Sequence, residues 1–255
     1  MTVTVFGAEE QTQFFEQGYL RLGQVVSNDA IDALRCRVDD IMLGKIRYDG
    51  LTMQLDSATG VYGDIPENTA SFKGATLNYR RIDRLDLDPL FLTYMRHPLF
   101  REITLTLIGP DVSMFRAMFM NKPAGRGTPL PWHQDIGIGW GLDRNPICTI
   151  WTALDKARPE SGCMQVVPGS HRSGFLNEQH FVSEEDQKKY ALDERCIHLE
   201  AETGEAVLLH NWLLHRSGVN PTGAPRRAFS VAYMDADTRN AKTGETFPMV
   251  FGKGV

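Results

Sequence analysis

A histidine and an aspartate two residues apart are the side chains of this sequence best suited to metal chemistry. They are His133 and Asp135, in the run PWHQDIG at 131–137. On a β-strand, alternate side chains share one face and lie roughly 6 to 7 Å apart along the chain, so this pair can converge on one metal ion. A second histidine from elsewhere in the chain would complete the site.

Two histidines compete for that position, about eighty residues further on. His210 and His215 each lie near the end of an apolar run within 204–221. Two histidines and one carboxylate on a triangular face leave about three of six octahedral positions open, which is the arrangement used by non-haem Fe(II) oxygenases. The open positions can take a co-substrate and O2.

Arg226 is a candidate for binding an anionic co-substrate. It follows His215 by eleven residues, beyond a segment at 220–225 rich in turn-forming residues, so the two residues are expected on neighbouring strands. A guanidinium there can hold a dicarboxylate by two parallel N–H···O bonds. Strand alternation allows only one of Arg226 and Arg227 to face inward, and the spacing from His215 favours Arg226.

The elements that must position these residues are mostly short strands. Runs rich in β-branched and aromatic residues alternate with turn signals at 112–120, 148–154, 162–167, 196–200, 206–210 and 228–234. Such spacing favours a sandwich or barrel over a parallel βαβ sheet. The polar stretch 184–193 is expected to be an exposed insertion between strands.

A single domain covering residues 1–255 is expected, because all-β barrels of this size are common. Its N-terminal helical part is expected at about 1–45, with helices over 9–18 and from residues 27–29 onward. The segment 45–78 has little periodicity and is predicted to be a long loop or a lid over the active site. The barrel itself is expected at about 100–240.

Charge and cysteine content limit the partners and the compartment. With 27 basic and 32 acidic residues the net charge is -5, which disfavours nucleic acid. The four cysteines are widely spaced, so neither a zinc knuckle nor a disulfide framework is indicated. We expect a cytoplasmic protein with no membrane partner, since no stretch approaches the ~18 apolar residues of a span. The sequence does not indicate an oligomeric state.

The chain resembles the phytanoyl-CoA dioxygenase family, a branch of the Fe(II)/2-oxoglutarate oxygenases, from roughly residue 78 to 237. Three blocks carry the resemblance: MFMNKP at 118–123 with WHQD at 132–135, WTAL at 151–154 with SGCMQVVPGSH at 161–171, and HRSG at 215–218 with Asn220 and Arg226. An isolated His-x-Asp is weak evidence, whereas three blocks in this order and spacing are specific.

The resemblance implies a fold that is mainly β with flanking helices, around a double-stranded β-helix (jelly-roll or cupin-like) core. It implies iron, Fe(II), on His133, Asp135 and His215 as the catalytic residues, with O2 and 2-oxoglutarate as the other reactants. Arg226 would pair with the distal carboxylate of 2-oxoglutarate. The residues implied to assist there are Trp151, Met118 and Ser217.

The same resemblance bears on the remaining histidines. In the family pattern, the residues that match Ser217, Asn220 and Arg226 follow the histidine ligand. The pattern therefore favours His215 as the third ligand. His210 is then expected to have a structural role or to support the ligands. The other histidines lack such context and are expected at the surface or in hydrogen bonds; they are His171, His180 and His198.

The implied reaction is oxidation of a C–H bond with release of succinate and CO2. Related halogenases replace the facial carboxylate by Gly or Ala, so the retained Asp135 favours hydroxylation, while desaturation, epoxidation and ring closure stay open. Two other functions also stay open: a cupin-like metal-binding protein, and a metal-dependent hydrolase or isomerase on the same barrel. Neither explains the spacing of Arg226.

The substrate is the part of the function that the sequence determines least. The family name suggests an acyl-CoA, but only short basic pairs such as Arg80-Arg81 and Arg226-Arg227 are available for the CoA phosphates. We therefore expect a small-molecule substrate. Candidate pocket residues are Arg116, Trp140 and Trp212, with Arg47, Tyr48 and Gln54 from the predicted loop.

Overall fold

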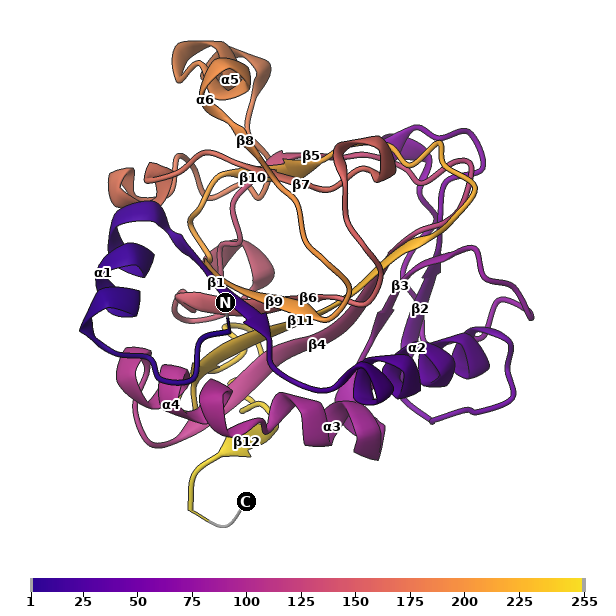
Figure 1. Cartoon of the computed structure of the whole chain (residues 1–255), viewed down its shortest axis with the longest axis horizontal. Helices are drawn as coiled ribbons and strands as arrows, with labels where there is room; N and C mark the ends of the chain where they lie inside the picture. Colours follow the sequence, from indigo (N-terminus) through magenta and orange to yellow (C-terminus); the bar gives the residue numbers. More distant parts are fainter. Residues whose placement is uncertain (1, 254–255) are drawn as a thin grey trace.

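The fold consists mainly of antiparallel strands in two facing sheets (Figure 1). The computed structural model describes residues 2–253. Within that range the large sheet has eight strands in the order β1-β9-β6-β11-β4-β3-β2, with β12 paired to β4, and the small sheet has four in the order β5-β10-β7-β8. This arrangement confirms the expected mainly β class with a double-stranded β-helix core.

From β4 onward the chain passes back and forth between the two sheets. The large sheet receives β4 (Val112–Lys122), β6 (Cys148–Ala153), β9 (Glu205–His210) and β11 (Arg226–Asp235). The small sheet receives β5 (Leu130–His133), β7 (Met164–Val166), β8 (Ile197–Leu199) and β10 (His215–Ser217). The large sheet is extended by β1 (Tyr19–Gln24), β2 (Thr52–Leu55), β3 (Tyr79–Asp83) and β12 (Met249–Phe251). Side chains distant in the sequence therefore face one another across the interior.

The main hydrophobic core lies outside the barrel. On β11, the side chains of Phe229, Val231 and Tyr233 belong to this core. Because successive side chains of a strand alternate in direction, Ala228 and Ser230 point inward. The helices α2 (Asn28–Met42), α3 (Pro89–Met95) and α4 (Pro98–Leu107) contribute the other side of the core and cover the outer face of the large sheet (Figure 1). The inner face is thereby left to line a pocket.

The N-terminal helices follow local sequence signals. Helix α1 (Ala8–Gln17) ends at Gly18, whose φ of 79° is left-handed and favours glycine. Helix α2 begins after Ser27, whose side chain accepts a hydrogen bond from the backbone N–H of Ala30. The apolar residues of α2 recur at helical spacing and are buried, as the sequence predicts.

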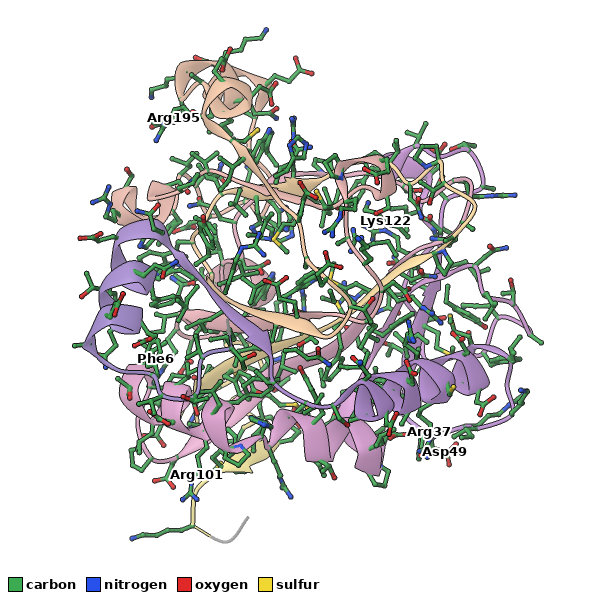
Figure 2. The ribbon with its side chains drawn as sticks, in the orientation of Figure 1. Phe6, Arg37, Asp49, Arg101, Lys122 and Arg195 are labelled. Atoms are coloured by element: carbon green, nitrogen blue, oxygen red, sulfur yellow. The ribbon has the colours of Figure 1, made fainter. Side chains whose placement is uncertain are left out.

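Two segments without strong periodicity contain regular structure. The segment 45–78 includes β2, which pairs with β3, and the 3-10 helix η1 (Tyr62–Asp64); that it moves as a lid stays a prediction. The expected insertion at 184–193 includes α5 (Glu184–Lys189) and the start of α6 (Leu192–Arg195), which project beyond the small sheet (Figure 1). Figure 2 shows Arg195 on this projection, and side chains such as Lys122 between the two sheets.

Candidate metal centre

His133 and His215 lie side by side on adjacent strands of the small sheet. They are directly opposite each other in the register of β5 and β10, and their ring centroids are 4.0 Å apart. Each ring Nδ1 lies 2.8 Å from the carbonyl oxygen of the residue two positions earlier, Pro131 or Leu213. An Nδ1–H that donates to a carbonyl leaves the Nε2 lone pair free, which is the form of histidine that binds a metal.

Asp135 completes the group. One ligand atom from each of His133, Asp135 and His215 lies within 4.8 Å of the others. Asp135 stands beyond the end of β5 rather than on it, and its backbone N–H donates to the carbonyl of Asn211 at 2.7 Å. The side chain of Asn211 accepts a hydrogen bond from the hydroxyl of Thr149 at 2.8 Å. The aspartate is therefore positioned by contacts that lead to the large sheet, whereas both histidines belong to the small sheet.

The electrostatic environment suits metal binding. Burial lowers the pKa of His133 well below its ordinary value, and the nearby His215 and His180 lower it further. The imidazole is therefore neutral at neutral pH, as a ligand must be. Two imidazole nitrogens and one carboxylate on one side of an ion fit Fe(II) and leave coordination positions toward the pocket.

A buried arginine lies at another part of the same pocket. Arg226 begins β11, and one terminal nitrogen of its guanidinium donates to the carbonyl of Gly162 at 2.9 Å. Its Nε has no hydrogen-bond partner among residues 2–253. Burial lowers the pKa of Arg226 to about 10, so the group remains charged at neutral pH. A buried cation with an unused N–H favours an anionic ligand.

The path from His215 to Arg226 differs from the expectation. The two residues were expected on neighbouring strands, but β10 lies in the small sheet and β11 in the large sheet. The connecting residues 218–225 cross between the sheets instead of forming a hairpin within one. As a result His215 and Arg226 line one pocket from opposite sheets, which leaves room for a ligand between them.

The other residues expected to contact 2-oxoglutarate line this pocket as well. Met118 of β4 and Trp151 of β6 both pair in register with Ser230 of β11, so they form one row across the inner face of the large sheet. Ser217 lies on the small sheet two residues after His215. The pocket encloses about 950 Å³ of space, counted with its open mouth.

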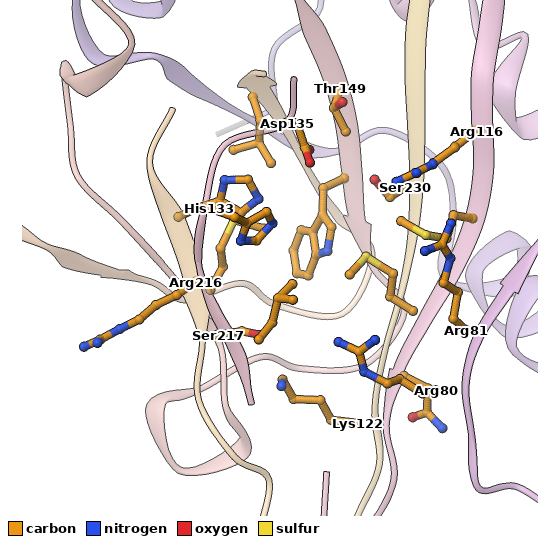
Figure 3. A pocket seen from close by; sticks show the side chains of 18 of the residues that line it. Arg80, Arg81, Arg116, Lys122, His133, Asp135, Thr149, Arg216, Ser217 and Ser230 are labelled. Atoms are coloured by element: carbon orange, nitrogen blue, oxygen red, sulfur yellow. The ribbon is translucent and has the colours of Figure 1, made fainter. Parts of the chain in front are cut away.

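The pocket also contains basic side chains that the sequence analysis did not connect. In addition to Arg116, it is lined by Arg80 and Arg81 of β3 and Lys122 of β4. Figure 3 shows these four across the pocket from His133 and Asp135, whereas Arg216 points away from them. In the sequence, only contiguous basic pairs such as Arg80-Arg81 are recognisable as clusters. Strand alternation does give one signal. Arg116 and Lys122 lie an even number of residues from the inward-facing Met118 on β4, so all three side chains point to the same face.

His180 corrects one expectation. It was expected at the surface or in a hydrogen bond, but it lines the pocket, with its ring centroid 4.7 Å from that of His133. Its Nδ1 is buried and has no hydrogen-bond partner within the described part of the chain. Nothing local in the sequence around residue 180 indicates this, because the contact depends on how the loop before α5 folds back over β5.

The other histidines lie away from the metal ligands. The Nδ1 of His210 accepts the backbone N–H of Trp212 at 3.1 Å, and its ring packs against Phe14 and His171. This placement agrees with the structural role expected for His210. His171 is buried, with its Nε2 2.9 Å from the carbonyl of Phe15, and His198 is exposed.

Of the three residues expected to contact substrate, one lines the pocket. This residue is Arg116. Trp140, at the end of the 3-10 helix η3 (Ile138–Trp140), supports the guanidinium of Arg116 from behind, with the Arg116 Cζ 4.6 Å from its ring centroid. Trp212 lies outside the pocket, so the structure does not support its expected role. The loop candidates Arg47, Tyr48 and Gln54 also lie elsewhere, in contact with Phe72, Asp88 and Pro66.

A double-stranded β-helix with two histidines and an aspartate converging inside it is typical of the non-haem iron oxygenase class. A family model described as phytanoyl-CoA dioxygenase (PhyH) matches residues 14–228. The chain belongs to this family and is an enzyme of the Fe(II)/2-oxoglutarate-dependent dioxygenase type.

Individual relatives agree with the family assignment. A probable phytanoyl-CoA dioxygenase from Caenorhabditis elegans is 30% identical over 243 residues, covering 89% of this chain and 75% of its own. EctD from S. alaskensis, crystallised with 2-oxoglutarate and 5-hydroxyectoine, has a TM-score of 0.73 at 19% identity over 94% of this chain and 80% of its own. The non-haem α-ketoglutarate-dependent carbocyclase SnoK from nogalamycin biosynthesis has a TM-score of 0.73 at 22% identity over 95% and 96%. Both solved structures are similar to this chain in fold.

Residues 2–253 contain no helix that combines the length and the apolar character needed to cross a membrane.

Proposed function

We propose that His133, Asp135 and His215 bind the Fe(II) of this enzyme, and that it hydroxylates a C–H bond of a small molecule with release of succinate and CO2. The observation that carries the proposal is the register pairing of the two histidines, with both Nδ1 atoms engaged by carbonyls. Both Nε2 atoms are then free to share one ion with Asp135. Bound there, Fe(II) and 2-oxoglutarate supply the oxidising chemistry.

Arg226 is proposed to bind the distal carboxylate of 2-oxoglutarate. Support comes from its burial, its free Nε and the hydrogen bond to Gly162, which holds the guanidinium in place. Ser217 lines the pocket on the strand of His215 and can donate its hydroxyl hydrogen to the same ligand.

Trp151 and Met118 are proposed to form the wall beside the carbon chain of 2-oxoglutarate. Trp151 is buried, and its row across the sheet includes Met118. Apolar walls of this kind exclude water, which strengthens the ion pair at Arg226. The retained Asp135 supports hydroxylation as the outcome.

We further propose that residues 1–255 act as one oxygenase domain in the cytoplasm, without a nucleic-acid or membrane partner. Residues 1, 254 and 255 of that domain lie outside the described part of the structure. The negative net charge and the four free thiols support the proposed compartment and partners.

The test is anaerobic titration of the Fe(II)-loaded protein with 2-oxoglutarate, followed by the weak visible metal-to-ligand charge-transfer band. We expect the band in the wild type and none in His215→Ala. Iron binding without a band in the wild type would contradict the proposed 2-oxoglutarate site. A band of full intensity in His215→Ala would remove that residue from the ligand set.

A further inference from the structure

Arg116 is a cation of the pocket that no acidic group among the described residues contacts directly. Its guanidinium has no hydrogen-bond or ion-pair partner among residues 2–253, and burial lowers its pKa to about 10. The charged groups that face it are Arg81, Asp83 and Asp135. Asp83 is already paired with the Nε of Arg81 at 2.9 Å, and Asp135 belongs to the metal ligands. A half-buried cation that faces a pocket favours an anionic ligand from outside the chain.

The guanidinium of Arg116 is held in place by aromatic rings. Its Cζ lies 4.6 Å from the ring centroid of Phe115 and 4.6 Å from that of Trp140. The two rings stack on each other with centroids 4.9 Å apart. Cation–π contacts orient a guanidinium without using its N–H donors. All donors of Arg116 therefore remain available to a ligand in the pocket.

Arg116 is separate from Arg226, which is proposed to bind 2-oxoglutarate, and from the two cations near Arg226. Arg226 and Lys122 are register partners, and Arg80 is the third charge of that group. Arg116 and Lys122 are six residues apart on β4, or roughly 20 Å along the strand. One five-carbon dicarboxylate at Arg226 therefore leaves Arg116 unsatisfied.

The position of Arg116 relative to the metal ligands fits a second ligand. Arg116 shares a row of the large sheet with Thr149, through Ala232. Thr149 bonds to Asn211, which holds the backbone of Asp135. Arg116 therefore lies in the row that leads to the metal ligands, and Arg226 lies three inward-facing rows away on the same sheet. Arg116 and Arg226 therefore offer two separate anion-binding groups in the pocket that the metal ligands also line.

His180 lies next to His133 and near Trp140, one of the two rings that contact Arg116. Its ring is 4.7 Å from that of His133 and 6.4 Å from that of Trp140, and both Asp135 and Arg116 act on it electrostatically. Its buried Nδ1 has no partner among the described residues. The side chain thus offers a second polar contact to a molecule that reaches Arg116 from the metal.

We propose that the substrate is a small organic acid whose carboxylate binds Arg116, with His180 as a further hydrogen-bonding group, so that a nearby C–H bond faces the metal. This inference rests on the proposed iron and 2-oxoglutarate sites. The rings of Tyr62 and Phe181 meet at a centroid distance of 5.3 Å and join the segment 45–78 to the loop that carries His180. Tyr62 also lines the pocket, so this contact ties the pocket wall to the loop that carries His180.

The test uses the protein loaded with Mn(II), as a redox-inert substitute for iron, and saturating 2-oxoglutarate. Its thermal midpoint and binding calorimetry are measured with a panel of short linear, cyclic and aromatic monocarboxylic acids, each beside its primary amide. We expect at least one acid to bind in preference to its amide. In Arg116→Gln the affinity for that acid should fall about 10- to 100-fold, because a charge-assisted bidentate pair is lost.

Controls separate this inference from the function on which it rests. Arg144→Gln removes an exposed arginine outside the pocket and should keep the acid preference. The 2-oxoglutarate charge-transfer band of the Fe(II) protein should be unchanged in Arg116→Gln. Loss of the band in that variant would assign Arg116 to the co-substrate and overturn the inference. A wild type that shows the band but binds no acid of the panel better than its amide would also overturn it.

Discussion

His133 and His215 are register partners on antiparallel strands, with their ring centroids 4.0 Å apart, although 82 positions separate them in the sequence. The Nδ1 of each ring contacts the carbonyl two residues before it, which leaves both Nε2 atoms free for a metal. These backbone contacts determine which ring nitrogen of each histidine can bind a metal.

Replacement of a ligand should abolish metal binding where replacement of the nearby His210 does not. His215→Ala removes one of three ligand atoms that converge within 4.8 Å, so we expect Fe(II) affinity to fall by at least about 100-fold. His210→Ala should keep metal affinity, since that ring packs against Phe14 and His171. Anaerobic metal titration measures both variants. Equal loss in the two would contradict the assignment of the third ligand.

Replacing the adjacent arginines Arg226 and Arg227 of β11 should affect different properties: 2-oxoglutarate affinity in the first case and stability in the second. Arg226→Ala should weaken 2-oxoglutarate binding about 10- to 100-fold while Fe(II) still binds, because one charge-assisted pair is removed. Arg227 points to the other face and forms ion pairs of 2.7 Å with Asp39 and Asp155. Arg227→Ala should instead reduce the free energy of unfolding by about 2–3 kcal/mol and leave 2-oxoglutarate affinity intact.

The measurements for this pair are the charge-transfer titration and urea unfolding. Unchanged 2-oxoglutarate affinity in Arg226→Ala would remove Arg226 from the co-substrate site. Weakened 2-oxoglutarate binding in a fully folded Arg227→Ala protein would mean that Arg227 also contributes to the co-substrate site. It would contradict the division of co-substrate binding and stability between the two faces of β11.

Gly162 should not tolerate a side chain. Its φ is 71°, and an added Cβ would lie 2.6 Å from the carbonyl oxygens of Gly218 and Val219. Gly162→Ala should therefore reduce the free energy of unfolding by about 2–4 kcal/mol, and should disturb the carbonyl that holds Arg226. Gly141→Ala is the matched control: its φ is 80°, but nothing lies within 4 Å of the added Cβ, so about 1 kcal/mol is expected.

The two glycine variants are compared by urea unfolding and by 2-oxoglutarate titration. If both lost the same stability, the left-handed backbone alone would account for the effect and the close approach of residues 218–219 would not matter. The 2-oxoglutarate affinity should fall only in Gly162→Ala.

Stability should decrease as the pH falls, and His210 should contribute to the decrease. Burial lowers the pKa of His210 to about 4, whereas a histidine in the unfolded chain has a pKa of about 6.5. Between these values the unfolded state binds a proton that the folded state does not, so stability is lost as the pH falls from about 6.5 to 4. Below about 4 both states are protonated and the loss from this group stops.

The contribution of His210 is measured by urea unfolding of metal-free protein at pH 7 and pH 5. His210→Asn should lose about 2 kcal/mol less than the wild type over this interval. His198→Asn, at an exposed position, should behave as the wild type does. A wild-type slope retained in His210→Asn would show that other buried histidines account for the pH dependence.

Features that depend on local residue order could be predicted from the sequence. The apolar spacing of α2, its start at one of residues 27–29 and the six strand-rich runs all match elements of the structure. Each depends on interactions within a few residues, and periodicity records those directly. The identity of His133, Asp135 and His215 as a group came from residue types and from the family pattern, and the structure brings these three side chains together.

The tertiary structure alone decided how strands distant in sequence meet. β5 and β10 have four and three residues, too few for a periodic signal, yet their pairing creates the metal site. The crossing of residues 218–225 between sheets set His215 opposite Arg226, and separate strands brought Arg80, Arg116 and Lys122 into one pocket. The sequence by itself determined which groups are available for chemistry. Their convergence depends on long-range strand pairing and burial, which no local pattern encodes.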